Sequence, residues 1–101
     1  MIMIRDVFQA KYGRGDALVA LLQELPQMAA GAGFAELSYR ILTDASGPFF
    51  TVVTETEAAS LAEWERQFAE SMGRPEFGEW FSRMVDLVDH GRREFYHIVE
   101  G

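Results

Sequence analysis

The chain contains no cysteine, and this absence excludes several kinds of chemistry at once. Disulfide bonds, thiolate metal sites and thiol catalysis all require that side chain. Basic residues are also scarce, because nine lysines and arginines stand against 16 aspartates and glutamates, for a formal net charge of −7. An acidic chain repels the phosphate backbone, so we expect no nucleic-acid partner.

Long hydrophobic runs are missing as well. The longest, Ala17–Leu22, is far shorter than the ~20 residues of a membrane-spanning helix, so we expect no membrane segment. The first residues, Met1–Asp6, show neither the basic region nor the long apolar region of a signal peptide. We therefore expect a cytoplasmic protein, and 101 residues are the length of a single domain.

The apolar residues recur with two alternating periods, and these periods define the expected elements. A period of two predicts strands over residues 2–11, 34–43, 49–56 and 93–100. A period of 3.6 predicts helical regions over residues 16–31 and 60–89, the second with a break near Gly73. The order β-α-β-β-α-β predicts an α+β, ferredoxin-like sheet with both helical regions on one face.

Local signals indicate where these elements begin and end. Asp16 is a reasonable N-cap for the first helix, and Ser60 with Glu63 fits a capping box at the start of the second helical region. Pro26 removes one amide donor and crowds the carbonyl of Leu22, so we expect the first helix to kink or end there. We expect the strand over residues 34–43 at an edge and the strand over 49–56 in the middle.

The first strand is apolar on both faces. Ile2, Ile4 and Phe8 lie on one side, and Met3 and Val7 lie on the other. A sheet face that meets water should be polar, so the second face is expected to be covered. The simplest cover is a second copy of the chain, and we therefore predict a homodimer.

Several side chains are candidates for a pocket between helices and sheet. Trp64 and Trp80 lie on the apolar stripes of the second helical region, and Tyr39 places a hydroxyl on an inward strand position. All three are also ordinary packing residues, and this alternative stays open. Arg5 and Asp6 interrupt the first strand, so one of them must face a covered side, either in an ion pair or as an anchor for an anionic ligand.

The two histidines offer the only imidazoles. His97 shares its strand parity with Phe95 and Val99, and it is either a hydrogen-bonded interface residue or the general acid or base of a pocket. His90 follows Asp86 by four residues at the predicted helix end, a spacing that suits a shared metal ion. A third ligand is missing nearby, so we predict no metal site.

Four loosely spaced motifs resemble those of a known family. They are Ser46-Gly47-Pro48-Phe49 leading into Val52-Val53, Glu55-Thr56-Glu57, Ser60-Leu61-Ala62-Glu63-Trp64-Glu65, and Pro75-Glu76-Phe77-x-x-Trp80. With these motifs, its length and its element order, the chain is similar to the NIPSNAP family of the dimeric α+β barrel superfamily. The resemblance implies one domain over residues 1–101, in which two protomers pair their ferredoxin-like sheets into a barrel.

Relatives in that superfamily include cofactor-free monooxygenases of antibiotic biosynthesis and haem-degrading enzymes. The haem-degrading group carries a histidine ligand on its second long helix, and residues 60–89 contain none, so we expect no cofactor. The resemblance implies a small apolar or aromatic ligand in a helix–sheet pocket. Its expected walls are Tyr39, Trp64, Trp80 and Arg5, with His97 as the catalytic residue of a cofactor-free monooxygenase. The alternative is a non-catalytic dimeric interaction module whose aromatic residues only pack the dimer.

The apolar second face of the sheet generates a prediction about solution mass. Light scattering at micromolar concentration should report about twice the chain mass of 11.4 kDa. A single-chain mass would contradict the expectation that a second copy covers the sheet.

Overall fold

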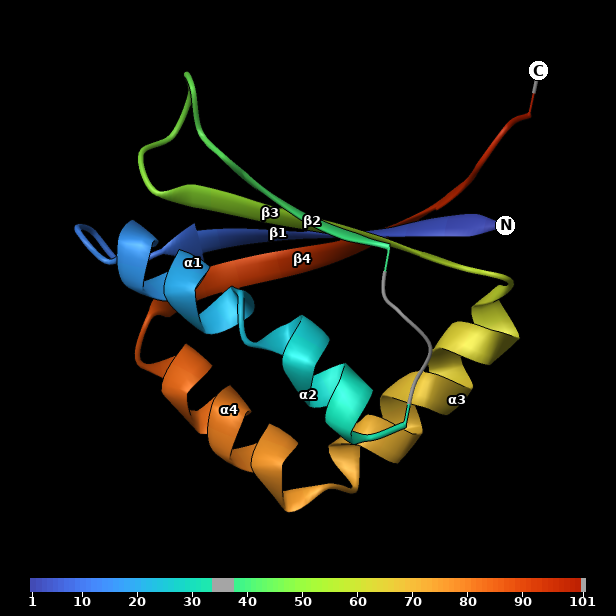
Figure 1. Cartoon of the computed structure of the whole chain (residues 1–101). Helices are drawn as coiled ribbons and strands as arrows, with labels where there is room; N and C mark the ends of the chain where they lie inside the picture. The colour runs from blue at the N-terminus through green and yellow to red at the C-terminus, as the bar shows by residue number, and fades with distance from the viewer. Residues whose placement is uncertain (34–37, 101) are drawn as a thin grey trace.

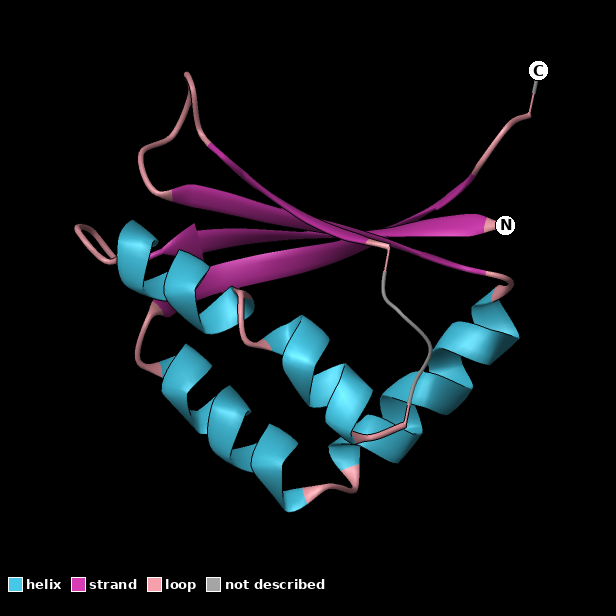
Figure 2. Cartoon of the chain, in the orientation of Figure 1, coloured by secondary structure: helices cyan, strands magenta, loops and turns pink. Residues whose placement is uncertain are grey.

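A computed structural model of the chain describes residues 1–33 and 38–100. Its strands are β1 (Ile2–Ala10), β2 (Tyr39–Thr43), β3 (Thr51–Ala58) and β4 (Val88–His97). Its helices are α1 (Gly15–Leu22), α2 (Leu25–Gly31), α3 (Leu61–Met72) and α4 (Pro75–Val85). The helices lie together on one face of an antiparallel sheet (Figures 1 and 2). The predicted α+β, ferredoxin-like order of elements is confirmed.

The strand order in the sheet is β2-β3-β1-β4, which follows from the composition of the strands. β1, which is apolar on both faces, and β3, which carries Val52 and Val53 on opposite faces, lie in the middle, whereas β2 is an edge, as predicted. Because side chains alternate along a strand, every second residue of β1 faces the helices. These residues are Ile2, Ile4, Asp6, Phe8 and Ala10.

The first helical region is interrupted at Pro26, as the sequence predicted. α1 ends at Leu22, and Pro26 lies in the first turn of α2, where its missing amide breaks no hydrogen bond within that helix. The start of α1 differs from the expectation, because the helix begins at Gly15 and Asp16 lies inside its first turn. The glycine at position 15 leaves room for Phe50, since a Cβ there would stand 3.0 Å from Cδ1 of Phe50.

β3 begins later than predicted because of the turn that precedes it. Phe49 and Phe50 belong to this turn, and Phe50 has a positive φ of 63°, which a bulky residue adopts only when its surroundings hold it. Hydrogen bonds from the end of β1 hold Phe50 in this conformation. The Ala10 amide donates to the Phe50 carbonyl at 3.0 Å, and the Gln9 side chain donates to the Phe49 carbonyl at 2.6 Å. The first residues of the predicted second strand, 34–37, lie outside the described residues.

The second helical region has the predicted break but ends earlier. α3 and α4 lie on either side of Gly73. α4 ends at Val85, and β4 already begins at Val88, because β1 offers pairing partners as far as Ala10. His90 is therefore a strand residue and not the helix-end residue assumed from the sequence.

The capping box predicted at the start of α3 is confirmed in one half. The Ser60 Oγ accepts a hydrogen bond from the Glu63 amide at 3.1 Å. The Glu63 carboxylate does not follow the predicted pattern, because it accepts from the side chains of Arg66 and Gln67 further along the helix. One capping hydrogen bond is worth about 1 kcal/mol.

The core lies between the sheet and the pair α1 and α4. Leu18 and Leu22 of α1 are fully buried against Ala10 and Val52 of the two central strands, and Trp80 joins them from α4. Burying a leucine side chain contributes about 1.5–3 kcal/mol. This cluster fixes α1 and α4 on the sheet.

The sheet face turned away from the helices carries apolar and charged side chains together. Within residues 1–33 and 38–100, no helix covers this face (Figure 1). Its apolar residues are Met3, Val7, Leu42, Val53 and Tyr96, and its charged residues are Arg5, Arg40, Glu55, Glu57, Arg92 and Glu94. The face is therefore less uniformly apolar than the sequence interpretation assumed, because β4 adds mainly polar residues to it.

Alanine substitutions at two glycines are predicted to change the free energy of unfolding in opposite directions. At Gly91 a Cβ would stand 3.3 Å from the carbonyl oxygen of Val7 and 3.1 Å from Cδ1 of Phe8, so Gly91→Ala should destabilise the fold by about 1–3 kcal/mol. At Gly78, inside α4, no described atom lies within 4 Å of such a Cβ, so Gly78→Ala should stabilise by about 0.5–1 kcal/mol. Urea denaturation measures both, and the reverse ranking would contradict this packing of β1 against β4.

Candidate functional site

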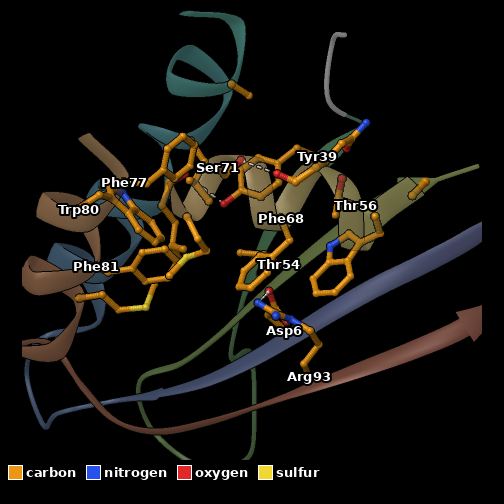
Figure 3. Close-up of a pocket in the computed structure, with 18 of the residues that line it drawn as sticks. Asp6, Tyr39, Thr54, Thr56, Phe68, Ser71, Phe77, Trp80, Phe81 and Arg93 are labelled. Carbon is orange, nitrogen blue, oxygen red and sulfur yellow. Dashed lines mark hydrogen bonds and ion pairs between the residues drawn. The ribbon is translucent and has the colours of Figure 1, made fainter. Parts of the chain in front are cut away.

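A cavity of about 210 Å³ lies between the sheet and helices α2, α3 and α4 (Figure 3). Aromatic rings form much of its wall, and those of Phe77, Trp80 and Phe81 gather at one end. An apolar cavity of about 150 Å³ is large enough to hold benzene, so this one has room for one or two fused rings. Its composition favours an apolar ligand.

The cavity becomes polar where it meets the sheet. The Arg93 guanidinium donates from Nε and Nη2 to the two carboxylate oxygens of Asp6, at 2.7 and 3.3 Å. The two residues lie directly opposite each other on β4 and β1, and Figure 3 shows them below the aromatic wall. An ion pair across the sheet, one of the two alternatives predicted for this position, is therefore confirmed with Asp6 as its acid.

The guanidinium of Arg93 also lies over two rings of α3. Its central carbon is 4.8 Å from the Trp64 ring centroid and 5.0 Å from the Phe68 ring centroid. The two rings stack on each other with centroids 5.0 Å apart, and Phe95 of β4 meets Trp64 edge-on. A cation over an aromatic face is attracted by about 0.5–1 kcal/mol or more at such sites. Arg93 thus joins α3 to the sheet at the polar end of the cavity.

The wall nearest α1 depends on the break at Pro26. In an uninterrupted helix the Leu22 carbonyl would accept from the amide of residue 26, but proline has no amide hydrogen. The Tyr39 hydroxyl donates to this carbonyl instead, at 3.0 Å. The Trp80 indole N–H donates to the neighbouring Leu21 carbonyl at 2.9 Å. Both side chains are therefore tied to the last turn of α1 while they line the cavity.

Apart from Asp6 and Arg93, the polar side chains of the wall include the hydroxyl groups of Tyr39, Ser71 and Thr56, which are neutral hydrogen-bonding groups. Burial raises the pKa of the Tyr39 phenol well above its ordinary value, and the nearby Asp6 carboxylate raises it further. The phenol is therefore a neutral donor. The Ser71 hydroxyl donates to the Gln67 carbonyl at 2.9 Å. The Thr56 hydroxyl oxygen is buried and has no hydrogen-bond partner among the described residues.

The residues predicted for a pocket separate into two groups. Tyr39, Trp64 and Trp80 line the cavity. Arg5 does not, because its strand position places it on the opposite face of the sheet, where its Nε is 3.9 Å from a carboxylate oxygen of Glu55. His97, the expected catalytic residue, is exposed at the last position of the edge strand β4 and does not reach the cavity. The placement of Arg5 and His97 in the pocket is thus corrected.

Sequence reasoning missed Arg93, although part of the signal was present. Arg93 and Phe95 share a parity in the last strand, as Asp6 and Phe8 do in the first. Asp6 and Arg93 are 87 residues apart in the chain, and a single sequence does not show which strands pair or in what register. The contact between them could therefore not be inferred.

Neither a metal site nor a membrane-spanning helix is found within residues 1–33 and 38–100. No three histidine, aspartate or glutamate side chains in these ranges come together in a way that would hold a metal ion. None of the helices in the same ranges has both the length and the hydropathy that crossing a bilayer requires.

Solved structures of two kinds share this fold. An uncharacterised NIPSNAP domain protein from Burkholderia xenovorans has a TM-score of 0.82 and 16% identity, with 98% of this chain and 95% of that chain covered. A NIPSNAP family protein from Agrobacterium tumefaciens has a TM-score of 0.83 and 15% identity, with 98% and 93% covered. An antibiotic biosynthesis monooxygenase has a TM-score of 0.72 and 16% identity, with 99% and 100% covered.

The expected resemblance to NIPSNAP proteins is confirmed at the level of the fold. No protein-family model matches the sequence, and no curated protein matches it. At identities this low, the likeness to solved structures shows a shared architecture and no shared chemistry.

The hydrogen bond from Tyr39 to Leu22 makes a prediction with two readouts. Tyr39→Phe leaves the Leu22 carbonyl without this donor, so the free energy of unfolding should fall by about 1–3 kcal/mol. Tyr12→Phe, in the turn after β1 and 83% exposed, serves as the matched control and should change it by less than about 0.5 kcal/mol.

The second readout is the dependence of stability on alkaline pH. The raised pKa of Tyr39 favours the protonated phenol in the folded state, so its stabilisation is complete below the ordinary value of ~10 and is lost as pH rises above it. Urea denaturation between pH 8 and 11 should therefore show a smaller loss of stability in Tyr39→Phe than in the unchanged protein. Equal losses would contradict the buried hydrogen bond.

Proposed function

We propose that this protein binds a small apolar or aromatic molecule in the cavity between its helices and its sheet. The observation that carries the proposal is the aromatic-lined cavity of about 210 Å³ with an ion pair at one end. Protein interiors keep few voids larger than a water molecule. A bound ring would gain dispersion contacts with the apolar side chains that line this cavity.

The alternative function, a dimeric interaction module without a small-molecule ligand, has less support. It requires both tryptophans to be packed solidly, as ordinary core residues are. Trp64 and Trp80 instead line a cavity, although Trp80 is also anchored to α1 by its indole hydrogen bond. The same side chains thus hold the helices together and leave room between them.

Oxygenation of an electron-rich aromatic molecule without a cofactor is a second candidate activity. Its support is the shared fold with an antibiotic biosynthesis monooxygenase, together with the aromatic-lined cavity. In such a reaction the protein orients the substrate and supplies a base. Asp6 is a better candidate for that base than His97, because its carboxylate borders the cavity. Oxygen uptake in the presence of a bound electron-rich aromatic molecule measures this activity.

We also propose that the protein is a homodimer whose protomers meet through the sheet faces that the helices leave open. The exposed apolar residues Leu42 and Tyr96 on this face support the proposal. Charges of both signs there, such as Arg40 and Glu55, suit a two-fold interface in which each surface meets its own copy. Leu42→Glu should lower the solution mass to that of one chain, whereas Val85→Glu, at an exposed position on the helix side, should not. The cytoplasmic location stays a prediction from the sequence.

Ligand binding is tested with a thermal-shift series of neutral one- and two-ring aromatic compounds. A compound that binds the folded state raises its melting temperature by mass action. Ala29→Leu adds three carbons to the cavity wall on α2, so we expect it to abolish that increase. Ala30→Leu, exposed on the same helix, should retain it.

The stability of the two variants without ligand serves as the control. Ala29→Leu fills part of a void and should melt no lower than Ala30→Leu. If neither the unchanged protein nor Ala30→Leu responds to any compound, the proposed function fails. A full response in Ala29→Leu would move the binding site away from this cavity.

A further inference from the structure

The charged side chains that border the cavity already neutralise one another. Among the described residues of its wall, the charged ones are Asp6, Glu57 and Arg93. Arg93 is bound through two nitrogens to both oxygens of Asp6. Glu57 pairs with Met3 in the strand register, so its side chain lies on the open face of the sheet, where it accepts a hydrogen bond from the Ser38 hydroxyl at 2.9 Å. The charged side chains that face the cavity are therefore one carboxylate and one guanidinium, bound to each other.

The guanidinium of Arg93 already interacts with neighbouring side chains through its face and through two of its nitrogens. Its face lies over Trp64 and Phe68, and two of its edge nitrogens point at Asp6. The side chains of Arg93 and Asp6 are 36% and 20% exposed, so water screens this pair only in part. An anionic ligand would have to compete with Asp6 for the same cation.

We infer that the Asp6–Arg93 pair makes the cavity select neutral aromatic ligands over anionic ones of the same shape. The inference rests on the proposed function and extends it to the charge of the ligand. A carboxylate that enters an apolar cavity loses its hydration, and a free cation is needed to offset that loss. The pair offers none, because the Arg93 guanidinium is already bound to both carboxylate oxygens of Asp6.

A neutral ligand with one hydroxyl group meets no such obstacle. Two carboxylate oxygens have about four lone-pair sites, and the hydrogen bonds from Arg93 occupy two of them. Asp6 can therefore still accept a hydrogen bond from a ligand. The pair rejects an anion through charge and still orients a neutral hydroxyl.

Three probes of similar shape test the inference at pH 7. They are 2-naphthol, which is neutral, 2-naphthoate, which is anionic, and 2-methylnaphthalene, which has no polar group. Tryptophan fluorescence titration should show 2-naphthol binding the unchanged protein at least tenfold more tightly than 2-naphthoate. This comparison needs no variant, so it holds even if substitutions at the pair impair folding.

Variants then assign the selectivity to the pair. Asp6→Asn leaves Arg93 unpaired, so 2-naphthoate should gain at least tenfold in affinity. Arg93→Gln leaves Asp6 unpaired, so 2-naphthoate should bind even more weakly than it does to the unchanged protein. The double variant Asp6→Asn/Arg93→Gln restores the charge balance and should return the preference for 2-naphthol. Arg92→Gln, one residue away on the open sheet face, is the matched control and should change none of these ratios.

The outcomes separate this inference from the proposed function. If 2-methylnaphthalene and 2-naphthol both fail to bind the unchanged protein, the proposed function and the inference fall together. If they bind but 2-naphthoate binds equally well, only the inference is overturned. It is also overturned if Asp6→Asn binds 2-methylnaphthalene normally and its ratio of 2-naphthol to 2-naphthoate affinity is unchanged.

Discussion

The hydrogen bond from the Tyr39 hydroxyl to the Leu22 carbonyl joins the sheet to the helix layer at the point where α1 ends. Pro26 creates the need for it, because a buried carbonyl left without a donor costs about 1–3 kcal/mol. The Trp80 indole N–H donates to the carbonyl of the preceding residue, Leu21, so the end of α1 is held both by β2 and by α4. α2 then departs from the line of α1 (Figure 1). The cavity lies between α2, α3, α4 and the sheet (Figure 3).

Strand alternation decides which charged side chain of β1 reaches the site. Arg5 and Asp6 are neighbours in β1, yet they lie on opposite faces and have different partners. Asp6 enters the helix side and meets Arg93, whereas Arg5 approaches Glu55 on the open side. A shift of one residue in the pairing would exchange these roles. The position of a single carboxylate therefore determines whether the cavity has a polar end.

The sequence predicted the elements better than it predicted their ends. Pro26 and Gly73 were sufficient to locate the two helix breaks, because their effects act within one turn of helix. Phe50 was assigned to a strand, since its residue type favours one and the hydrogen bonds that hold its positive φ come from β1. The start of β4 was placed too late, because pairing with β1 and not local composition extends that strand to Val88.

The candidate site shows the same division between local and distant causes. The sequence alone determined that Tyr39, Trp64 and Trp80 face inward, because periodicity assigns a face to each residue from its neighbours in the chain. Only the tertiary structure decided that His97 stands outside at the end of an edge strand, that Asp6 meets Arg93, and that a void remains between the helices. These features depend on strand register and on the distance between packed layers, which arise from contacts between residues far apart in the chain.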